Sequence, residues 1–501
     1  MTFATLRAHQ QEAKQIAEDI ARGTWSLRAR KHIVLAVTPG GGKTGAARVI
    51  AETLMAAGVI NRVLFLAPRA NLVKQVGFSF REGGLPLVDG EAGKMKQTTM
   101  LKQHGACATY QMVTKDVEGF TWYVADKRTL LVLDEAQFLA IKKIENIGPW
   151  STSETEADWY QSIKPLYDAA VAVVIMTGTI NRQDGQPLAF VDYHDGIPSI
   201  DVRYTRKMAL AERAVIPMEF IATDADAAWS INGFARRTTL REAKGKDVAR
   251  TRSAFLDDPA AVDEFARKAL DHWKTWRHRN SLASESKCIV LAKSQEEARR
   301  LCKWMQDEGI RTAIAISDDG DGRSTERITD FSKGWGGHVL VTVAMAHVGL
   351  DVPDATHLIC LSRYRSTPWL EQAFARVTRF NPKGGSWDAQ RAFIFVPDEL
   401  EMQAFIEEMQ FEQEEAIRER KSNAINAIMP RSVGGEIENL GAQLNGGVRY
   451  AADGIGFLSD NECAGVAWVD ERHPEFAHLA PTDKLRIWNA IQAATTSPAA
   501  E

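Results

Sequence analysis

The sequence predicts an α/β protein with two tandem domains, each built on a parallel sheet. Residues 1 to about 205 alternate strand-like apolar runs with helix-like runs, and a second alternation of the same kind begins near Lys287. Such alternation is typical of parallel sheets that are covered by helices on both faces. In addition, the glycine-rich segment T-P-G-G-G-K-T, Thr38–Thr44, lies between a strand-like and a helix-like run. We therefore expect two α/β domains with a cleft between them.

Each expected strand is a short apolar run that contains β-branched residues. In the first domain these runs are His32–Val37, Arg62–Pro68, Ala106–Tyr110, Thr129–Asp134 and Val171–Thr177. In the second domain they are Cys288–Ala292, Thr312–Ile316, Val339–Val343, His357–Leu361 and Ala392–Val396. Helical stretches separate the runs, and a charged helix with an apolar stripe is expected over residues 399–420.

Changes in composition divide the chain into four parts. We expect a first α/β domain over 1–205, a linker with a basic helical insert over 206–284, and a second α/β domain over 285–400. Residues 401–501 then form a C-terminal helical extension whose role the sequence does not reveal.

The overall composition limits the classes of protein to which the chain can belong. Its 501 residues are 45% hydrophobic and 25% charged, which is ordinary for a soluble globular protein. The net charge of −4 means that nucleic-acid binding would require local basic patches. The five cysteines form no C-x-x-C pair, which argues against a zinc module and fits a reducing cytosol. The sequence has neither a membrane-length apolar run nor an apolar signal segment, so a cytoplasmic protein is expected.

The glycine-rich segment predicts a phosphate-binding loop. Glycines allow the backbone N–H groups to turn toward an anion, and the following helix adds the positive end of its dipole. In this interpretation Lys43 reaches the β- and γ-phosphates of a nucleotide, while the Thr44 hydroxyl binds Mg²⁺. Val37 occupies a position that is glycine in the general motif, and a simple turn between a strand and a helix remains the alternative. The glycines of the loop are Gly40, Gly41 and Gly42.

A second segment places two carboxylates directly after a buried strand. Thr129–Ala136 reads T-L-L-V-L-D-E-A, so Asp134 and Glu135 stand at the carboxyl end of the predicted strand. Ligands bind at this edge in open α/β sheets. Asp134 is expected to hold Mg²⁺, and Glu135 to polarise the water that attacks the γ-phosphate. The alternative is a strand that ends in a solvated acidic turn.

Further motifs follow in a fixed order, and with them the chain resembles superfamily 2 helicases and translocases over roughly residues 1–400. The matching segments are Leu6–Gln10 (Q motif), Leu66–Gln75 (Ia), Ala108–Gln111 (Ib), Asp134–Gln137 (II), Thr177–Thr179 (III), Val339–Pro353 (V) and Glu371–Arg379 (VI). D-E-A-Q, T-G-T and a motif VI without histidine resemble the branch of restriction-enzyme motor subunits and DNA-repair helicases. One departure is Ala375, where most relatives have glycine.

The resemblance implies two RecA-like domains that bind ATP and Mg²⁺, and it assigns roles to matching residues. Gln10 senses the adenine, and Gly349, Asp351 and Gln372 lie near the nucleotide. Arg69, Thr109 and Thr342 contact the nucleic-acid backbone. Gln137, Thr177 and Thr179 couple the nucleotide site to that track.

The resemblance also makes Arg376 and Arg379 arginine fingers that reach across the cleft. They are three residues apart, so they would share one face of a helix expected over Pro368–Phe380. Cations are needed there because the transition state of phosphoryl transfer spreads negative charge over the equatorial oxygens. Surface arginines on an exposed helix are the alternative.

Two segments between the domains combine basic residues with aromatic ones. Arg236–Arg252 contains seven Lys or Arg residues, and His272–Arg279 mixes Trp273 and Trp276 with basic side chains. Such a mixture suits a surface that follows a nucleic-acid strand. The alternative, a solvated amphipathic helix whose tryptophans pack on a neighbour, is equally consistent with the sequence.

The sequence thus favours an ATP-driven helicase or translocase, with DNA preferred over RNA as its partner. An RNA helicase remains open, and so does an ATPase switch or motor subunit of a larger restriction, defence or repair complex. A small-molecule kinase is disfavoured because such kinases lack the second sheet and motif VI. A protein partner would bind through the C-terminal extension.

Overall fold

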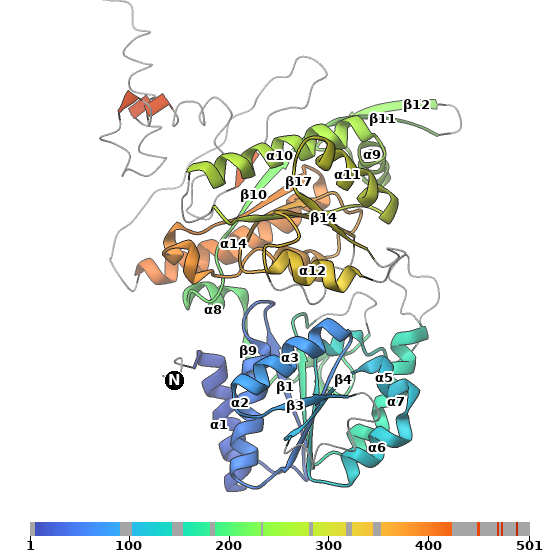
Figure 1. The fold of residues 1–501 in the computed structure, drawn as a ribbon, viewed down its shortest axis with the longest axis vertical. Coiled ribbons are helices and arrows are strands. Elements are labelled where there is room, and N and C mark those ends of the chain that lie inside the picture. The colour runs from blue at the N-terminus through green and yellow to red at the C-terminus, as the bar shows by residue number, and fades with distance from the viewer. Residues whose placement is uncertain are drawn as a thin grey trace, which may run out of the picture. The chain divides into compact units, whose positions relative to one another are not determined.

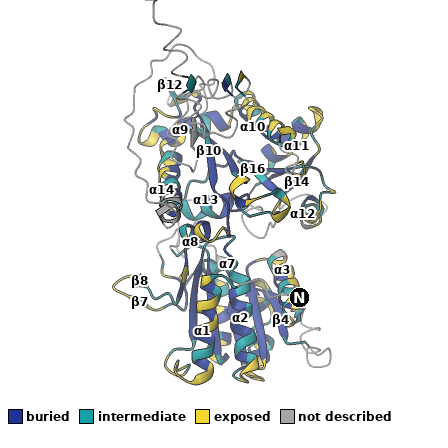
Figure 2. Ribbon diagram, turned by 90° about the vertical axis from the view of Figure 1, so that its left-hand side faces the viewer, coloured by how far each residue is buried: buried dark blue, intermediate teal, exposed yellow. Residues whose placement is uncertain are grey.

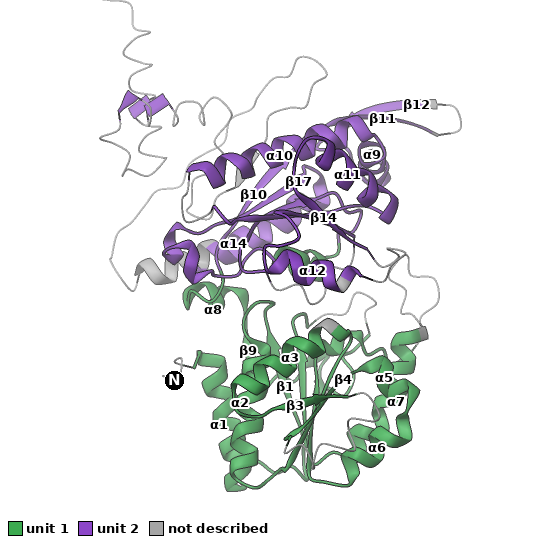
Figure 3. Ribbon diagram, viewed as in Figure 1, with its two compact units in different colours: residues 1–215, 346–351, 366–375 green, residues 216–345, 352–365, 376–501 purple. Residues whose placement is uncertain are grey.

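The computed structural model describes residues 6–90, 103–142, 154–180, 186–231, 234–279, 284–316, 323–343, 352–422 and 448–450, together with 468–469, 472–473 and 487–488. These residues belong to two compact units (Figure 3). The first comprises residues 1–215, 346–351 and 366–375, and the second comprises residues 216–345, 352–365 and 376–501.

The first unit contains a parallel sheet that presents the carboxyl ends of its central strands along one edge. Its strand order is β3-β4-β2-β5-β6-β1-β9, and every neighbouring pair is parallel. The central strands are wholly buried, as expected when helices cover both faces (Figure 2). The strands are β1 (His32–Val37), β2 (Arg62–Ala67), β3 (Leu87–Asp89), β4 (Gly105–Thr109), β5 (Thr129–Leu133), β6 (Ala172–Thr177) and β9 (Val202–Tyr204).

Helices on the two faces of this sheet complete the first unit (Figure 1). On one face lie α1 (Ala8–Arg22), α2 (Lys43–Ala56) and α3 (Ala70–Glu82). The other face carries α5 (Tyr110–Lys115), α6 (Val117–Ala125) and α7 (Glu154–Ala169), whose apolar side chains share a core with the strands. A short hairpin, β7 (Tyr193–His194) and β8 (Ile197–Pro198), precedes β9, and α8 (Arg206–Ala211) follows it.

The second unit contains a sheet of the order β14-β15-β13-β16-β17-β10-β18. All neighbouring pairs are parallel except β10 and β18, which are antiparallel. The strands are β10 (Met218–Thr223), β13 (Lys287–Leu291), β14 (Thr312–Ala315), β15 (Val339–Thr342), β16 (Ala355–Cys360), β17 (Ala392–Pro397) and β18 (Val448–Tyr450). The two sheets confirm the predicted α/β fold of two parallel-sheet domains.

Helices α9 (Lys246–Leu256), α10 (Pro259–Arg279) and α11 (Gln295–Asp307) share a core with this sheet. Trp273 is buried in that core, and the ring centroid of Trp276 lies 4.6 Å from that of Phe393. The tryptophans therefore pack inside the unit, as the alternative interpretation held, and do not present a surface for stacking bases. The remaining helices of the second unit are α12 (Ser324–Ser332) and α14 (Leu400–Ser422), while α13 (Thr367–Phe374) belongs to the first unit.

Residues 206–284 differ from the expected linker with a basic helical insert. They include β10, a strand of the second sheet, and the antiparallel hairpin of β11 (Asp226–Ile231) and β12 (Phe234–Thr239). The basic run therefore begins on a strand, in which Arg236 pairs with Trp229 and Arg237 with Ala228. Charge density alone led to the helical expectation, whereas cross-strand packing decides the local structure.

The helix expected over Pro368–Phe380 is also shorter than predicted. Helix α13 ends at Phe374, with Ala375 as its C-cap at φ −59°. Beyond it, Val377 and Thr378 are buried, and the backbone carbonyl of Thr378 accepts a hydrogen bond from the backbone N–H of Ile216 at 2.8 Å. Arg376 and Arg379 therefore do not share a helical face. The φ of Ala375 is one that any residue adopts, so glycine is not required for its backbone conformation.

Within the described part of the chain, none of the helices is both long enough and apolar enough to span a bilayer.

Candidate nucleotide-binding site

The glycine-rich loop joins β1 to α2 at the carboxyl edge of the first sheet. Gly40 and Gly42 have φ of 79° and 99°, conformations that side chains rarely adopt. Gly42 is the N-cap of α2 and has no capping side chain, and the N-terminus of a helix attracts anions through its backbone N–H groups and the positive end of its dipole. The loop thus has the backbone geometry of a phosphate cradle.

Gly41 shows how the loop accommodates Val37. A Cβ atom at Gly41 would lie 2.9 Å from Cγ1 of Val37, 3.0 Å from Cδ1 of Tyr204 and 2.8 Å from the Thr38 carbonyl oxygen. Because these contacts are too short for a methyl group, Gly41 is the residue that lets the loop pack closely on Val37. The larger side chain at position 37 is therefore matched by the missing side chain at position 41.

Two carboxylates surround the loop lysine. Lys43 Nζ lies 3.6 Å from Oδ1 of Asp134 and forms a short ion pair with Oε1 of Glu135. Asp134 is 4% exposed, and burial raises the pKa of its carboxyl group to about 6; Lys43 acts against this shift and the charge of Glu135 adds to it. One lysine thus faces two acids, and this surplus of negative charge suits a site that accepts a cation.

Backbone contacts fix both carboxylates in place. The N–H of Asp134 donates to the Leu66 carbonyl at 2.9 Å, and the Tyr110 hydroxyl donates to the Asp134 carbonyl at 2.5 Å. Glu135 has φ 52° and ψ 50°, a left-handed conformation that is uncommon outside glycine. Such conformations occur mostly where the surrounding structure enforces them, often at functional sites.

A hydrogen-bonded relay extends from Glu135 to the end of β6. Gln137 Nε2 donates to Oε2 of Glu135 at 2.6 Å, and the hydroxyl of Thr177 lies 2.8 Å from Oε1 of Gln137. The same hydroxyl accepts a bond from the backbone N–H of Thr179 at 3.1 Å. The structure therefore brings the three expected coupling residues into one chain of contacts with Glu135, although their coupling role stays a prediction.

The start of α1 closes over the loop. The Arg7 guanidinium donates to the Gly41 carbonyl, and Gln10 Nε2 donates to the Gly42 carbonyl at 3.4 Å. Oε1 of Gln10 in turn accepts a bond from the backbone N–H of Arg7 at 3.2 Å. Gln10, expected beside the adenine, thus lies against the phosphate loop together with an arginine.

The donor set fits ATP and Mg²⁺. The cradle offers backbone N–H groups and Lys43 to phosphate oxygens. The half-buried Thr44 hydroxyl and the Asp134 carboxylate are oxygen ligands of the kind that Mg²⁺ prefers. In the described residues no three His, Cys, Asp or Glu side chains converge as a protein-only metal site. Mg²⁺ that is bound together with a nucleotide takes further ligands from phosphate oxygens and water.

The other predicted nucleotide-contacting residues lie partly outside the described residues. Gln372 is buried in α13, and Arg376 and Arg379 follow that helix. Gly349 and Asp351 lie outside the described residues. The roles of Gln372, Arg376 and Arg379 stay predictions.

The three residues expected to contact nucleic acid stand at the ends of strands. Arg69 is exposed at the N-cap of α3. Thr109 caps α5, and its hydroxyl accepts a bond from the Met112 N–H at 3.1 Å. Thr342 ends β15 and is fully buried, and its hydroxyl has no hydrogen-bond partner among the described residues. Their contacts with nucleic acid stay predictions.

Two arginines of the basic run are used inside the second unit. Arg241 bonds to the buried Asp398, with Nε 2.8 Å from Oδ2. Arg252 Nη1 lies 3.1 Å from both carboxylate oxygens of the buried Glu399. These arginines therefore neutralise internal carboxylates and are not available to a phosphate backbone.

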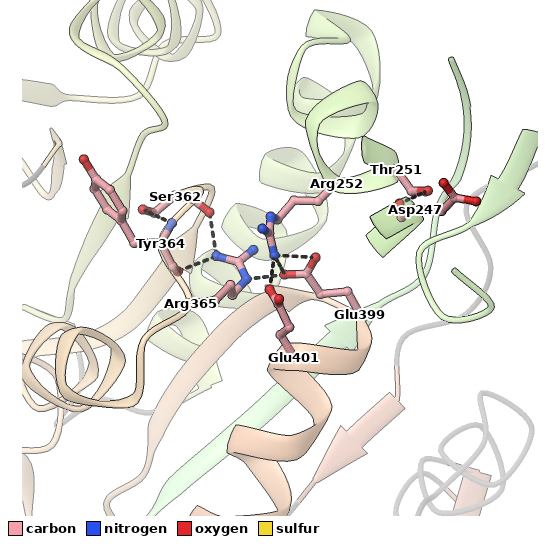
Figure 4. Close-up of polar contacts among 8 residues, drawn as sticks. All are labelled: Asp247, Thr251, Arg252, Ser362, Tyr364, Arg365, Glu399 and Glu401. Atoms are coloured by element: carbon pink, nitrogen blue, oxygen red, sulfur yellow. Dashed lines mark hydrogen bonds and ion pairs between the residues drawn. The ribbon is translucent and has the colours of Figure 1, made fainter. Parts of the chain in front are cut away.

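Glu399 lies between two guanidinium groups (Figure 4). Besides Arg252 it binds Nε of Arg365, whose Nη1 also donates to the carbonyls of Ser362 and Tyr364 at 2.6 and 2.7 Å. Burial acts to lower the pKa of Arg252, but Glu399 and Glu401 outweigh this and raise it. We call Arg252, Arg365, Glu399 and Glu401 the Arg252–Glu399 cluster.

Comparison with known families agrees with this geometry. The family model described as "Type III restriction enzyme, res subunit" matches residues 3–182, and the model "Helicase conserved C-terminal domain" matches residues 271–381. The chain belongs to superfamily 2 of the helicases and translocases. Proteins of this superfamily hydrolyse ATP, and the two matches fall on the two units that carry the parallel sheets.

Among its relatives, this superfamily 2 chain matches an uncharacterized protein of Mycobacterium tuberculosis strain CDC 1551 with 26% identity over 380 residues. That match covers 72% of this chain and 57% of the relative. A Mycobacterium leprae protein, also uncharacterized, is 25% identical over 383 residues, which cover 72% of this chain and 58% of the relative. The chain thus spans little more than half the length of these curated relatives.

The fold is similar to that of a solved structure, the ATP-dependent type ISP restriction-modification enzyme LlaBIII bound to DNA. The TM-score is 0.51 at 16% sequence identity, and the match covers 79% of this chain and 28% of that one. At this identity the similarity concerns the fold.

Sequence reasoning missed Arg7, Tyr110, Tyr204 and Glu212 as residues of the superfamily 2 site. Arg7 and Tyr110 stand inside the Q motif and motif Ib, so their positions were a usable signal. Tyr204 and Glu212 belong to no motif, and only the pairing of β9 with β1 brings Tyr204 to the loop.

Proposed function

We propose that this chain is an ATP-driven motor that moves along DNA or separates its strands. The observation that carries the proposal is the meeting of Lys43 with Asp134 and Glu135 beside the glycine loop, joined through Gln137 to Thr177. A simple turn or a solvated acidic end of a strand would not require this convergence of three separate segments.

In the proposed reaction, the residues of the first unit hold the triphosphate of ATP. Lys43 exchanges its carboxylate partner for the β- and γ-phosphate oxygens, and the backbone N–H groups of the loop complete the cradle. Thr44 and Asp134 would hold Mg²⁺, which when bound neutralises charge on the phosphates.

Glu135 is the proposed base for the attacking water. It pairs with Lys43 through Oε1 and with Gln137 through Oε2. When phosphate draws Lys43 away, Oε1 becomes able to accept a proton from water, while Gln137 keeps the carboxylate oriented. Since Gln137 also contacts Thr177, this exchange supplies a physical route from the γ-phosphate to motif III.

Arg376 and Arg379 are proposed to supply positive charge to the transition state. Support for this role comes from the resemblance of motif VI and from the need for cations around the equatorial oxygens. Loss of an arginine finger is expected to reduce kcat by roughly 10³–10⁵-fold and to leave ATP affinity nearly unchanged.

DNA is the proposed track. The support is the type III restriction family model over residues 3–182 and the similar fold of a restriction enzyme whose structure was solved with DNA. A motor subunit of a larger restriction or repair complex is the second candidate, and the family model over residues 3–182 favours it, since that model describes a subunit of a restriction enzyme. RNA is the alternative track, and the ATPase measurements described next distinguish it from DNA.

Measured ATPase rates test the proposal directly. Turnover should rise with DNA, either single-stranded or duplex, relative to RNA or no nucleic acid, and strand-displacement assays then separate unwinding from translocation. Glu135→Gln should still bind ATP but should turn over roughly 10²–10⁴-fold more slowly, because the amide cannot take the proton from water. Turnover equal to that of the parent would remove Glu135 from the role of base.

A further inference from the structure

We propose that Tyr204 and Glu212 are positioning residues for ATP: they brace the phosphate loop from beneath and hold the Arg7–Gln10 cap above it. The inference rests on the proposed function, because it concerns the same nucleotide site. Neither residue belongs to a motif of the superfamily.

The cap above the loop depends on where α1 begins. Arg7 is the N-cap residue of α1, and its guanidinium donates to the Gly41 carbonyl. Gln10, in the first turn, reaches the Gly42 carbonyl, and a Cβ at Gly45 would lie 2.7 Å from its Nε2. Both side chains therefore require the N-terminus of α1 to stay at a fixed distance from the loop.

Tyr204 supports the loop from the other side. It ends β9 and is the register partner of Val37, the last residue of β1. Its backbone carbonyl accepts a bond from the Thr38 N–H at 2.8 Å, and its ring leaves no room for a side chain at Gly41. The ring is 1% exposed and its centroid lies 4.0 Å from that of His9 on α1.

Glu212 connects the cap to the brace with one carboxylate. Oε1 accepts a bond from the backbone N–H of Ala8 at 3.3 Å, and Oε2 accepts one from the Tyr204 hydroxyl at 2.9 Å. A carboxylate at the N-terminus of α1 also interacts favourably with the helix dipole. Glu212 thus fixes α1 relative to Tyr204, and through both of them the carbonyl groups of Gly41 and Gly42.

The position of Glu212 in the chain gives the brace a second consequence. Glu212 is the C-cap of α8, and the next residue, Arg213, has φ 59°. The long N-terminal stretch of the first unit, residues 1–215, ends at Val215, shortly after Glu212. The brace therefore ends next to the segment through which the chain passes from the first unit into the second.

The test compares ATP binding with stability in matched variants. Glu212→Ala removes both bonds and should raise the Kd of a non-hydrolysable ATP analogue with Mg²⁺, and the KM for ATP, by ~3–10-fold, with kcat within twofold. Tyr204→Phe keeps the ring under Gly41 and removes only its link to Glu212, so it should weaken binding by ~2–5-fold. Glu212→Gln can keep both contacts, because its oxygen accepts from the Ala8 N–H while its NH₂ group donates to the Tyr204 hydroxyl oxygen, and it should restore most of the affinity. Glu18→Ala is the control, because it removes a carboxylate from the outer side of α1, where Glu18 pairs with Lys14 and Arg22.

The outcomes separate the inference from the proposed function. A parent protein that neither binds nor hydrolyses ATP would overturn the proposed function, and this inference with it. A parent that binds ATP while Glu212→Ala has a lower melting temperature but an unchanged Kd would overturn the inference alone. If Glu212→Ala does not fold, Tyr204→Phe decides: weaker binding at an unchanged melting temperature supports the brace, and parental affinity rejects it.

Discussion

Each unit contains a cluster of ionised side chains, and the two clusters differ in the ratio of cations to carboxylates. In the first unit Lys43 faces both Asp134 and Glu135, whereas in the second unit two arginines bracket two glutamates in the Arg252–Glu399 cluster (Figure 4). The first cluster carries more negative than positive charge, and the pKa of Asp134 is raised. In the Arg252–Glu399 cluster the charges of the two carboxylates are balanced by those of the two arginines.

The charge balance of a cluster distinguishes a ligand site from a structural ion pair. A buried carboxylate without enough cations binds a proton or a metal ion to recover the solvation that it lost. A carboxylate with a guanidinium on each side has no such need, and removing one partner mainly destabilises the fold. The first cluster should therefore control chemistry and the second should control stability.

The largest expected effect is on chemistry in the first cluster. Lys43→Ala should lower ATP turnover by at least ~10³-fold, since the phosphate contacts of the loop lysine are lost. The melting temperature should change by only a few degrees, because Asp134, whose pKa is already raised to about 6, can take up a proton when its lysine partner is lost. Substantial turnover in a well-folded variant would break the assignment of this cluster to catalysis.

The second cluster should respond in the opposite way. Glu399→Ala leaves Arg252 and Arg365 without their shared carboxylate and should lower the free energy of unfolding by ~3–5 kcal/mol. Turnover per folded molecule should stay within about twofold. Glu401→Ala is the matched control: its side chain is 49% exposed, so its loss should cost under ~1 kcal/mol. If Glu399→Ala and Glu401→Ala lowered the free energy of unfolding equally, the buried role of Glu399 would be contradicted.

A pair of neutral histidines, of which His357 is fully buried and His272 is partly buried, differs from both charged clusters. His272 Nδ1 lies 2.9 Å from Nε2 of His357, and burial lowers the pKa of His272 to about 4 and that of His357 well below its ordinary value. As pH falls, the histidines of the unfolded chain take up protons before those of the folded chain. The free energy of unfolding is therefore at its full value above pH ~6.5 and decreases by roughly 2–3 kcal/mol as pH falls toward 4. His272→Asn should reduce this pH dependence in urea unfolding, whereas His194→Asn, at an exposed position, should not. If His272→Asn keeps the pH profile of the parent, His272 does not contribute to the loss of stability in acid.

The smallest effect concerns the exposed hairpin. Arg236 and Arg237 are 63% and 61% exposed and pair with Asp247 and Asp226. If they contact DNA, replacing both by Gln should flatten the slope of log K against log salt by ~1–2. Arg241→Gln should instead destabilise the fold, because it leaves the buried Asp398 without its arginine. An unchanged slope in the double variant would assign the hairpin arginines to surface ion pairs.

The amino-acid sequence alone was enough to predict the central strands of the two sheets and the core of the nucleotide site. Apolar β-branched runs, glycine at the loop and two acids at the end of a strand are short-range signals, so His32–Val37 was predicted with the bounds of β1. The central strands were placed within two residues of their observed ends. The presence of Lys43, Asp134 and Glu135 in one site followed from the shared carboxyl edge of a parallel sheet.

Which charged and aromatic side chains pack in the interior depends on contacts between residues that are far apart in the sequence. Arg252 and Glu399 are 147 residues apart, and Tyr204 reaches Gly41 only because β9 pairs with β1. Trp273 and Trp276 looked equally suited to stacking bases and to packing, and the sheet beneath α10 selected packing. Local patterns record the preferences of neighbouring residues, whereas the partner of a long polar or aromatic side chain depends on which distant elements the fold brings within a few ångströms.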